Sequence, residues 1–418
     1  MNISYTIKAK LARAGIVLLA LSPFSIVSFT LQSLIALLSL LIPSPHRIVS
    51  QVPLAPRIDR ILRPMMLIYL VTLAGTAFSI SELIFVDEIN IGVILARFGG
   101  QQFALVMGFF QVLCGYFLAQ YYGETTIRRT IMIPFIIIVC VAGYQYIATA
   151  TGLPYVGKYV NDRFVGLRPS SLAVEPKYLA SYLSCIVFYL GYLFFESTRS
   201  PRLAYSLGLI AGLYFFVAAA SANGAMIFIL LIVLMIFSLP IRWRFAIGAL
   251  VIISLQAASM RFEAEEFGLR GTHLDLIQNL GAIDLGLLDD LIALPILAWI
   301  DNPGKVIFGF GPGLMHFFAA RHSDQATWWA GDSYIEGNIS LLMYASNFGV
   351  VLFGLLLVSI TLTAIALVRR PPLGFNTSTS FFFVGTFIAG AVITGNISVP
   401  FFISIGWIFG SHVARRSY

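Results

Sequence analysis

The stretch IMIPFIIIVCVAGYQYIATAT, residues 131–151, decides the fold class of this chain. It contains no charged side chain and directly follows Arg128, Arg129 and a threonine, and about 20 apolar residues are enough to cross a membrane as a helix. Runs of the same kind recur along the chain, which is 59% hydrophobic and 11% charged, less than half the charged share of a soluble domain. Polar residues are too few to cover so apolar a core. The sequence therefore predicts an all-α, polytopic membrane protein.

The positions of the basic residues predict how these runs cross the membrane. A basic segment, Arg47 to Arg63, follows the first run, which is long enough for two short helices. If that run crosses twice, the N-terminal segment with Lys8, Lys10 and Arg13, this basic segment and the later basic gaps all share one side. Together they hold 17 of the 26 Lys and Arg residues, as short cytoplasmic loops do. We expect about 12 spans in one membrane domain, 1–418, with both termini cytoplasmic. The runs are 14–43 (counted twice), 65–85, 102–121, 131–151, 176–195, 203–220, 224–239, 244–259, 339–368, 380–397 and 400–413.

The acidic residues gather on the opposite side. Eleven of the 19 lie in residues 260–338, a predicted long, partly helical periplasmic loop in which 283–300 look like an amphipathic interfacial helix. Residues 152–175 form a second outer loop, and a third lies near 86–101. The spans carry few charges and show no repeat, which favours an enzyme at the outer face over a transporter. The net charge of +7 follows from loop topology and does not predict nucleic-acid binding.

The first candidate motif lies in the shorter outer loop and enters the next span. Arg163, Arg168 and Lys177 are cations on the side where basic residues are otherwise scarce. Guanidinium groups bind phosphate through paired hydrogen bonds and stay charged in a medium of low dielectric constant. Pro176 is typical of a helix start, so Glu175 before it is either a helix cap or a catalytic carboxylate.

Two further motifs occupy the second half of the long loop. Residues 302–313 are rich in glycine around Lys305 but match neither the P-loop nor the dinucleotide fingerprint, so a turn is the simpler interpretation. Asp332 and Glu336 precede the 339–368 run, and on a helix they would share one face. Such a pair suits both a catalytic site and a helix cap.

The same loop contains further candidate ligands and bases. Arg261 and Arg270 bracket three glutamates, which is typical of a solvated charged face, but the nearby His273 also suits a phosphate site. His316 lies beside two phenylalanines and is typical of a packed histidine, whereas His322 is the more exposed candidate base. The three cysteines stand apart in apolar runs, so neither a disulfide nor a metal site is predicted.

Taken together, these patterns resemble the bacterial O-antigen polymerase and O-antigen ligase superfamily. The resemblance covers the topology and three local patterns in a fixed order. The chain departs from the family at Asn223, where an arginine is frequent. It also has Asp332 and Ser333 where the ligases typically show a histidine, which favours the polymerases. The patterns are Arg163…Gly166…Glu175-Pro176…Ala180, then Ser221-Ala-Asn-Gly224-Ala, and then Gly309-Phe-Gly311-Pro-Gly313 followed by Asp332-Ser333-Tyr334 and Leu341…Asn347-Phe348-Gly349.

The resemblance implies a GT-C-like glycosyltransferase at the periplasmic face of the bacterial inner membrane. Its donor would be an undecaprenyl-diphosphate-linked oligosaccharide, and it would need no nucleotide sugar, metal or other cofactor. Membrane lipid and a chain-length regulator protein are the further partners expected, and nucleic acid is not one.

The leading hypothesis is therefore a polymerase that joins lipid-linked repeat units. The cations that would hold the donor diphosphate are Arg163, Arg168, Arg270 and Arg261. The candidates for the base that deprotonates the acceptor hydroxyl are Asp332 first, then Glu336, Glu175 and His322. One alternative is a ligase that transfers finished polymer to lipid A-core. An alternative of another class is a flippase for lipid-linked oligosaccharides.

Overall fold

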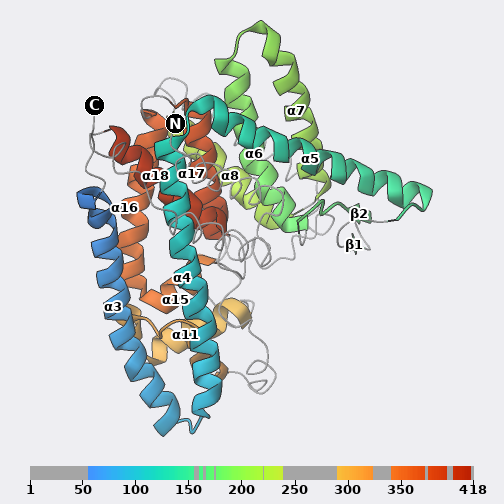
Figure 1. The fold of residues 1–418 in the computed structure, drawn as a ribbon. Coiled ribbons are helices and arrows are strands. Elements are labelled where there is room, and N and C mark those ends of the chain that lie inside the picture. Colours follow the sequence, from blue (N-terminus) through green and yellow to red (C-terminus); the bar gives the residue numbers. More distant parts are fainter. Residues whose placement is uncertain are drawn as a thin grey trace, which may run out of the picture.

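The computed structural model is a helical bundle with one small hairpin (Figure 1). It describes residues 55–154, 160–162, 166–173, 176–219, 221–238, 290–322, 340–371, 375–392 and 399–415. The elements are α3 (Ala55–Phe85), α4 (Ile91–Tyr121), α5 (Glu124–Thr151), β1 (Val160–Asp162), β2 (Gly166–Arg168), α6 (Pro176–Glu196), α7 (Arg199–Ala218), α8 (Ala222–Ser238), α11 (Asp290–Asp301), α12 (Lys305–Phe308), α13 (Met315–Ala320), α15 (Ser340–Phe348), α16 (Val350–Arg369), α17 (Thr377–Val392) and α18 (Val399–Arg415).

The fold is helical, as predicted, and several helices are long and apolar enough to cross a membrane, which supports a membrane protein. Several outward-facing side chains are large and apolar, such as Leu203, Ile210 and Val217 along one face of α7, each more than 60% exposed. In water such faces would be unfavourable, whereas lipid covers them. The total of about 12 spans stays a prediction. Four helical segments within the described ranges are long and apolar enough to cross a membrane: Glu124–Thr151, Pro176–Glu196, Pro201–Ala218 and Val350–Arg369.

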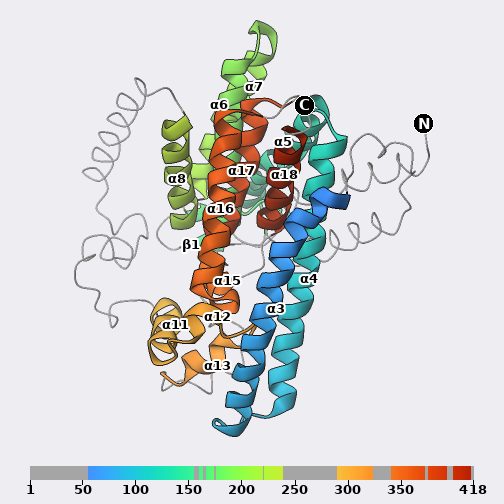
Figure 2. The ribbon, with the colours of Figure 1, turned by 90° about the vertical axis from the view of Figure 1, so that its left-hand side faces the viewer.

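Several connections between helices lie at the two ends of the bundle. The junctions α4–α5 and α6–α7 and the last residues of α16 and α18 lie at one end (Figures 1 and 2). The α3–α4 turn and helices α11 to α13 lie at the other end. The basic gaps at 128–129, 199–202 and 369–370 therefore share one end of the molecule.

Glycines let α4 and α18 approach each other at backbone distance. A Cβ atom at Gly115 would overlap the Ile403 carbonyl oxygen, and one at Gly406 would overlap the Val112 carbonyl oxygen. Small residues at such crossings are how membrane helices pack closely, because lipid tails provide no hydrophobic drive for association. This contact joins the C-terminal helix to the middle of α4.

Two carboxylates from other helices cap the start of α17. Glu124 accepts hydrogen bonds from the backbone N–H of Asn376 and the hydroxyl of Thr379, at 3.1 and 2.8 Å. Glu196 accepts from the backbone N–H and the hydroxyl of Ser378, at 3.3 and 2.8 Å. Both satisfy N–H groups that a helix start leaves without partners, and their charge suits the positive end of its dipole. The first residue of α5 and the last of α6 are thereby tied to α17.

The structure corrects three expectations and tests part of a fourth. The predicted outer loop near 86–101 is only a turn, because Asn90 caps α4 by accepting a hydrogen bond from the Gly92 N–H, and helix follows. The 339–368 run is two helices, broken at Gly349, whose φ is +84°. Residues 152–175, predicted only as a loop, contain the antiparallel β1–β2 hairpin, which the all-α prediction did not include. Of the predicted amphipathic segment 283–300, the described part is helical in α11. The runs 14–43 and 244–259 lie outside the described residues.

Candidate functional site

Arg168 is the last residue of β2 and joins the hairpin to the end of α7. Its Nε donates a hydrogen bond to the carbonyl oxygen of Ala219, 3.0 Å away. The guanidinium has four more N–H donors on its two Nη atoms, which is the fork geometry that recognises phosphate. The side chain is half-buried, so its charge is partly shielded from solvent.

The first and second sequence patterns meet in space next to this arginine. Ala219 lies two residues before Ser221, where the second pattern begins. Gly224 of that pattern packs directly on Ala180, the last residue of the first, with no room for a Cβ between them. The Ser184 hydroxyl lies 2.9 Å from the Ala180 carbonyl oxygen and 3.1 Å from that of Gly224. Two motifs that are more than 40 residues apart therefore form one packed unit.

The described parts of the third pattern, the glycine segment and the end of α15, come together at the break between α15 and α16. The Phe310 N–H donates to the Ser346 carbonyl oxygen at 2.8 Å, and a Cβ on Gly309 would lie 2.5 Å from the Asn347 carbonyl oxygen. Gly309, Gly311 and Gly313 all have positive φ, a conformation that glycine adopts at little cost. The predicted turn at 302–313 is found only in part, because the short helix α12 occupies Lys305–Phe308 within it.

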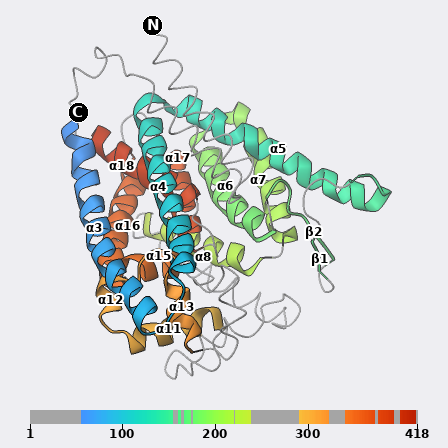
Figure 3. The same ribbon diagram turned by 60° about the horizontal axis from the view of Figure 1, so that its bottom comes forward.

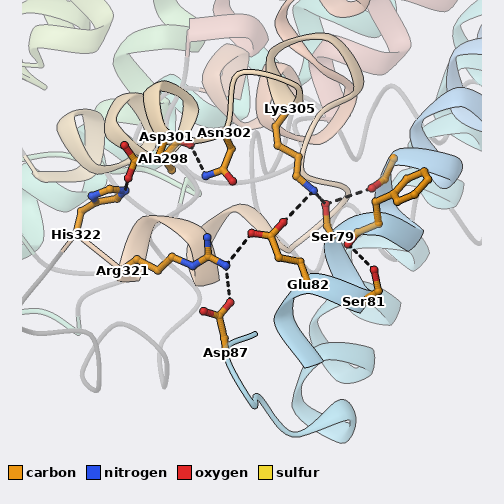
Figure 4. Close-up of polar contacts among 12 residues, drawn as sticks. Ser79, Ser81, Glu82, Asp87, Ala298, Asp301, Asn302, Lys305, Arg321 and His322 are labelled. Atoms are coloured by element: carbon orange, nitrogen blue, oxygen red, sulfur yellow. Dashed lines mark hydrogen bonds and ion pairs between the residues drawn. The ribbon is translucent and has the colours of Figure 1, made fainter. Parts of the chain in front are cut away.

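A cluster of four charged residues holds α12 and α13 against the end of α3 (Figure 4). Arg321 Nη2 lies 3.0 Å from Glu82 Oε1 and 2.6 Å from Asp87 Oδ2. Lys305 Nζ lies 3.7 Å from Glu82 Oε2 and donates to the Ser79 hydroxyl at 2.5 Å. The cluster contains two cations and two carboxylates and is electrically balanced.

The chemistry of this cluster suits docking better than anion binding. Burial lowers the pKa of Lys305, and Glu82 opposes that shift. Burial also acts to lower the pKa of Arg321, but the hydrogen bonds that Arg321 donates to Asp87 and Glu82, together with their negative charges, outweigh it and the pKa is raised. Both cations also lie over the ring of Phe318. Because each cation already faces a carboxylate, an incoming diphosphate would meet repulsion from Glu82 and Asp87.

His322 follows α13 and faces the last residue of α11. Its Nε2 lies 3.2 Å from Asp301 Oδ2 (Figure 4). The distance is that of an ion pair, but the ring is not aligned for a hydrogen bond. A carboxylate therefore already faces Nε2, one of the two ring nitrogens that could act as a base.

His316 is buried, as the sequence predicted for a packed histidine. Its side chain is 1% exposed, and burial lowers its pKa to about 3; the positive charge of Arg97 acts in the same direction, while a hydrogen bond with the Gly313 backbone opposes the shift. The ring is therefore neutral at physiological pH.

Replacing His316 with glutamine should reduce the dependence of stability on pH. The ring's ordinary pKa is 6.5, so below that pH the unfolded chain binds a proton that the folded protein excludes until about pH 3. The wild-type protein therefore loses stability as the pH falls through this window, by up to about 1.4 kcal/mol per pH unit, and is unaffected by this ring above it.

Thermal denaturation of the solubilised protein between about pH 4.5 and 8 measures this effect. Gln111→Ala is the control, because it changes a fully buried side chain that carries no charge, and it should leave the slope in place. Equal slopes for wild type and His316→Gln would contradict the prediction.

The structure places two of the eight predicted site residues and does not bring those two together. Arg168 lies in the hairpin beside α5 and α7, whereas His322 lies with α11 to α13 beside α3 (Figures 1 and 3). In the part of the chain that the structure describes, no group of three or more His, Cys, Asp or Glu side chains could hold a metal ion. Arg163, Glu175, Arg261, Arg270, Asp332 and Glu336 lie outside the described residues.

Sequence reasoning missed Gln145 and the partners of Arg321. Gln145 could have been noticed as an amide inside an apolar run, since such a group must find a hydrogen-bond partner. Glu82 and Asp87 flank the end of an apolar run, and the sequence predicts no more for them than a place on the outer side of the membrane. Nothing in their spacing indicates that they pair with a residue more than 230 positions away.

The fold and these contacts define an α-helical membrane protein with polar clusters at one end of the bundle and along α5. No family model matches the chain, and no curated protein matches it either.

Proposed function

We propose that this protein is a polysaccharide polymerase of the O-antigen type, a glycosyltransferase that joins undecaprenyl-diphosphate-linked repeat units at the periplasmic face of the inner membrane. The observation that carries the proposal is the hydrogen bond from Arg168 to Ala219. It puts Arg168, which lies within the stretch of the first family-like pattern, beside the second pattern, which would give a shared site for one ligand.

The chemistry follows from the charge that develops in the reaction. The bond between the sugar anomeric carbon and the diphosphate oxygen breaks, and a bond to the acceptor oxygen forms. The leaving undecaprenyl diphosphate gains negative charge, which a guanidinium stabilises without a metal. The acceptor hydroxyl gives its proton to a base.

Each candidate residue has a role in this scheme. Arg168, with Arg163, Arg270 and Arg261, would hold the diphosphate. Asp332, Glu336, Glu175 and His322 are the candidates for the base. The pairing of His322 with Asp301 makes it the weakest of these candidates.

Reconstitution of the full chain in lipid vesicles with a lipid-linked repeat unit tests the proposal. A polymerase yields lipid-linked products of increasing length and releases undecaprenyl diphosphate, with no lipid A-core present. A ligase releases the carrier only when lipid A-core is added, and a flippase moves the substrate across the bilayer without lengthening it. Either of the last two results would replace the proposed function.

A further inference from the structure

A fully buried glutamine lies in the apolar helix α5. Gln145 is 0% exposed, and its side-chain amide contacts the segment that follows Arg168. Its Oε1 accepts hydrogen bonds from the backbone N–H groups of Ser170 and Ser171, at 3.1 and 2.9 Å. Its Nε2 donates to the carbonyl oxygen of Ser171 at 3.2 Å. One side chain therefore satisfies three backbone groups of a non-helical segment.

These bonds give hydrogen-bond partners to buried backbone groups of the segment 170–171. After β2 the chain folds back along α5, where the Ser171 hydroxyl donates to the Ile138 carbonyl oxygen at 2.7 Å. Ser170 and Ser171 are both 0% exposed, and Ser171 has a φ of +53°, which is unfavourable for a residue other than glycine. Irregular backbone buried beside an apolar helix needs partners from the protein, because water is scarce there.

The hydrogen bonds between Gln145 and this segment also fix the position of Arg168. Only Pro169, which is buried and has a restricted φ, separates Arg168 from Ser170. On one side Gln145 holds the chain to α5, and on the other the arginine's Nε bonds to Ala219 at the end of α7. A shift of Ser170 and Ser171 would therefore be passed directly to the guanidinium.

We infer that Gln145 is a positioning residue that holds Arg168 in place for binding the lipid diphosphate. The inference rests on the proposed function and adds to it a residue inside a candidate span, remote in sequence from the arginine that it positions. The Gln145 side chain bonds to the backbone of Ser170 and Ser171 and would act through Arg168.

The test uses the full chain in lipid nanodiscs, with undecaprenyl diphosphate as the probe and undecaprenol as the reference lacking phosphate. Gln145→Ala should weaken the binding of undecaprenyl diphosphate about tenfold and leave that of undecaprenol unchanged, an effect of the size of a lost positioning hydrogen bond. Gln145→Glu keeps the acceptor for both serine N–H groups and should restore most of the affinity. Gln111→Ala, which removes an equally buried glutamine from α4, is the matched control.

Two further measurements distinguish a loss of Arg168 positioning from a general loss of structure. Gln145→Ala should raise amide hydrogen exchange in 166–173, and Gln111→Ala should not. The double variant with Arg168→Ala should bind the diphosphate no more weakly than Arg168→Ala alone, because positioning has no effect once the guanidinium is gone.

The outcomes distinguish this inference from the proposed function. If wild type binds the two lipids equally, the proposed function fails. The proposed function stands if wild type prefers the diphosphate and Arg168→Ala loses that preference. In that case only the inference fails if Gln145→Ala binds the diphosphate as well as Gln111→Ala does. It also fails if the losses of affinity caused by Gln145→Ala and Arg168→Ala add fully in the double variant.

Discussion

The Gly115→Ala variant is expected to lose most of its thermal stability. The added methyl group would overlap the Ile403 carbonyl oxygen and come within 2.9 Å of the Trp407 backbone nitrogen, both in α18. These are backbone atoms in a helix and cannot rotate away, so α4 and α18 must separate. We expect a cost of about 3 kcal/mol or more, at the upper end of overpacking effects, measured as a fall in the melting temperature of the purified protein.

The same helix provides a matched control. Gly99 is also in α4, and nothing lies within 4 Å of the position its Cβ would take. Gly99→Ala should leave stability unchanged or raise it by about 0.5 to 1 kcal/mol, because alanine favours the helix more than glycine does. Gly406→Ala, which meets Val112 from the α18 side, should repeat the loss. Equal melting temperatures for Gly115→Ala and Gly99→Ala would contradict the α4–α18 packing described above.

The class of fold was predictable because it depends on composition and run length. Residues 131–151 have too few polar groups for any environment but lipid or a deep core, and most of the described helices coincide with a predicted run. The ends of helices were less predictable. Gly349 breaks an apolar run because its neighbours at Ile307 and Gly309 leave no room for a side chain, and that contact depends on tertiary structure.

The site was predictable only in part, for a similar reason. Arg168 is visible in the sequence because it departs from the predicted distribution of basic residues between the two sides of the membrane. Its partners are backbone groups of residues far away, and a carbonyl at Ala219 has no sequence signature. Likewise His322 appeared exposed, since its contact with Asp301 requires α11 and α13 to fold back on each other.

Arg168→Ala is expected to reduce the rate of chain lengthening by about 100-fold or more, the usual cost of removing a group that stabilises charge in a transition state. Arg168→Lys keeps the charge but loses the fork of donors, so we expect an intermediate loss. The rate is measured in vesicles with a lipid-linked repeat unit. Alanine at Arg163 or Arg270 should act in the same direction if these residues hold the same diphosphate.

Arg202→Ala is the matched control for the structural part of this loss. Arg202 also donates through Nε to a backbone carbonyl oxygen, that of Ser197 at 2.7 Å, but it lies at the opposite end of α7 and is exposed. Both alanine variants lose one hydrogen bond of the same type. If their melting temperatures are equal and their rates of chain lengthening differ, the difference in rate comes from the lost contact between Arg168 and the diphosphate. If Arg168→Ala made polymer as fast as Arg202→Ala, the guanidinium would serve only to fasten the hairpin to Ala219, and the cation for the departing diphosphate would have to be another residue.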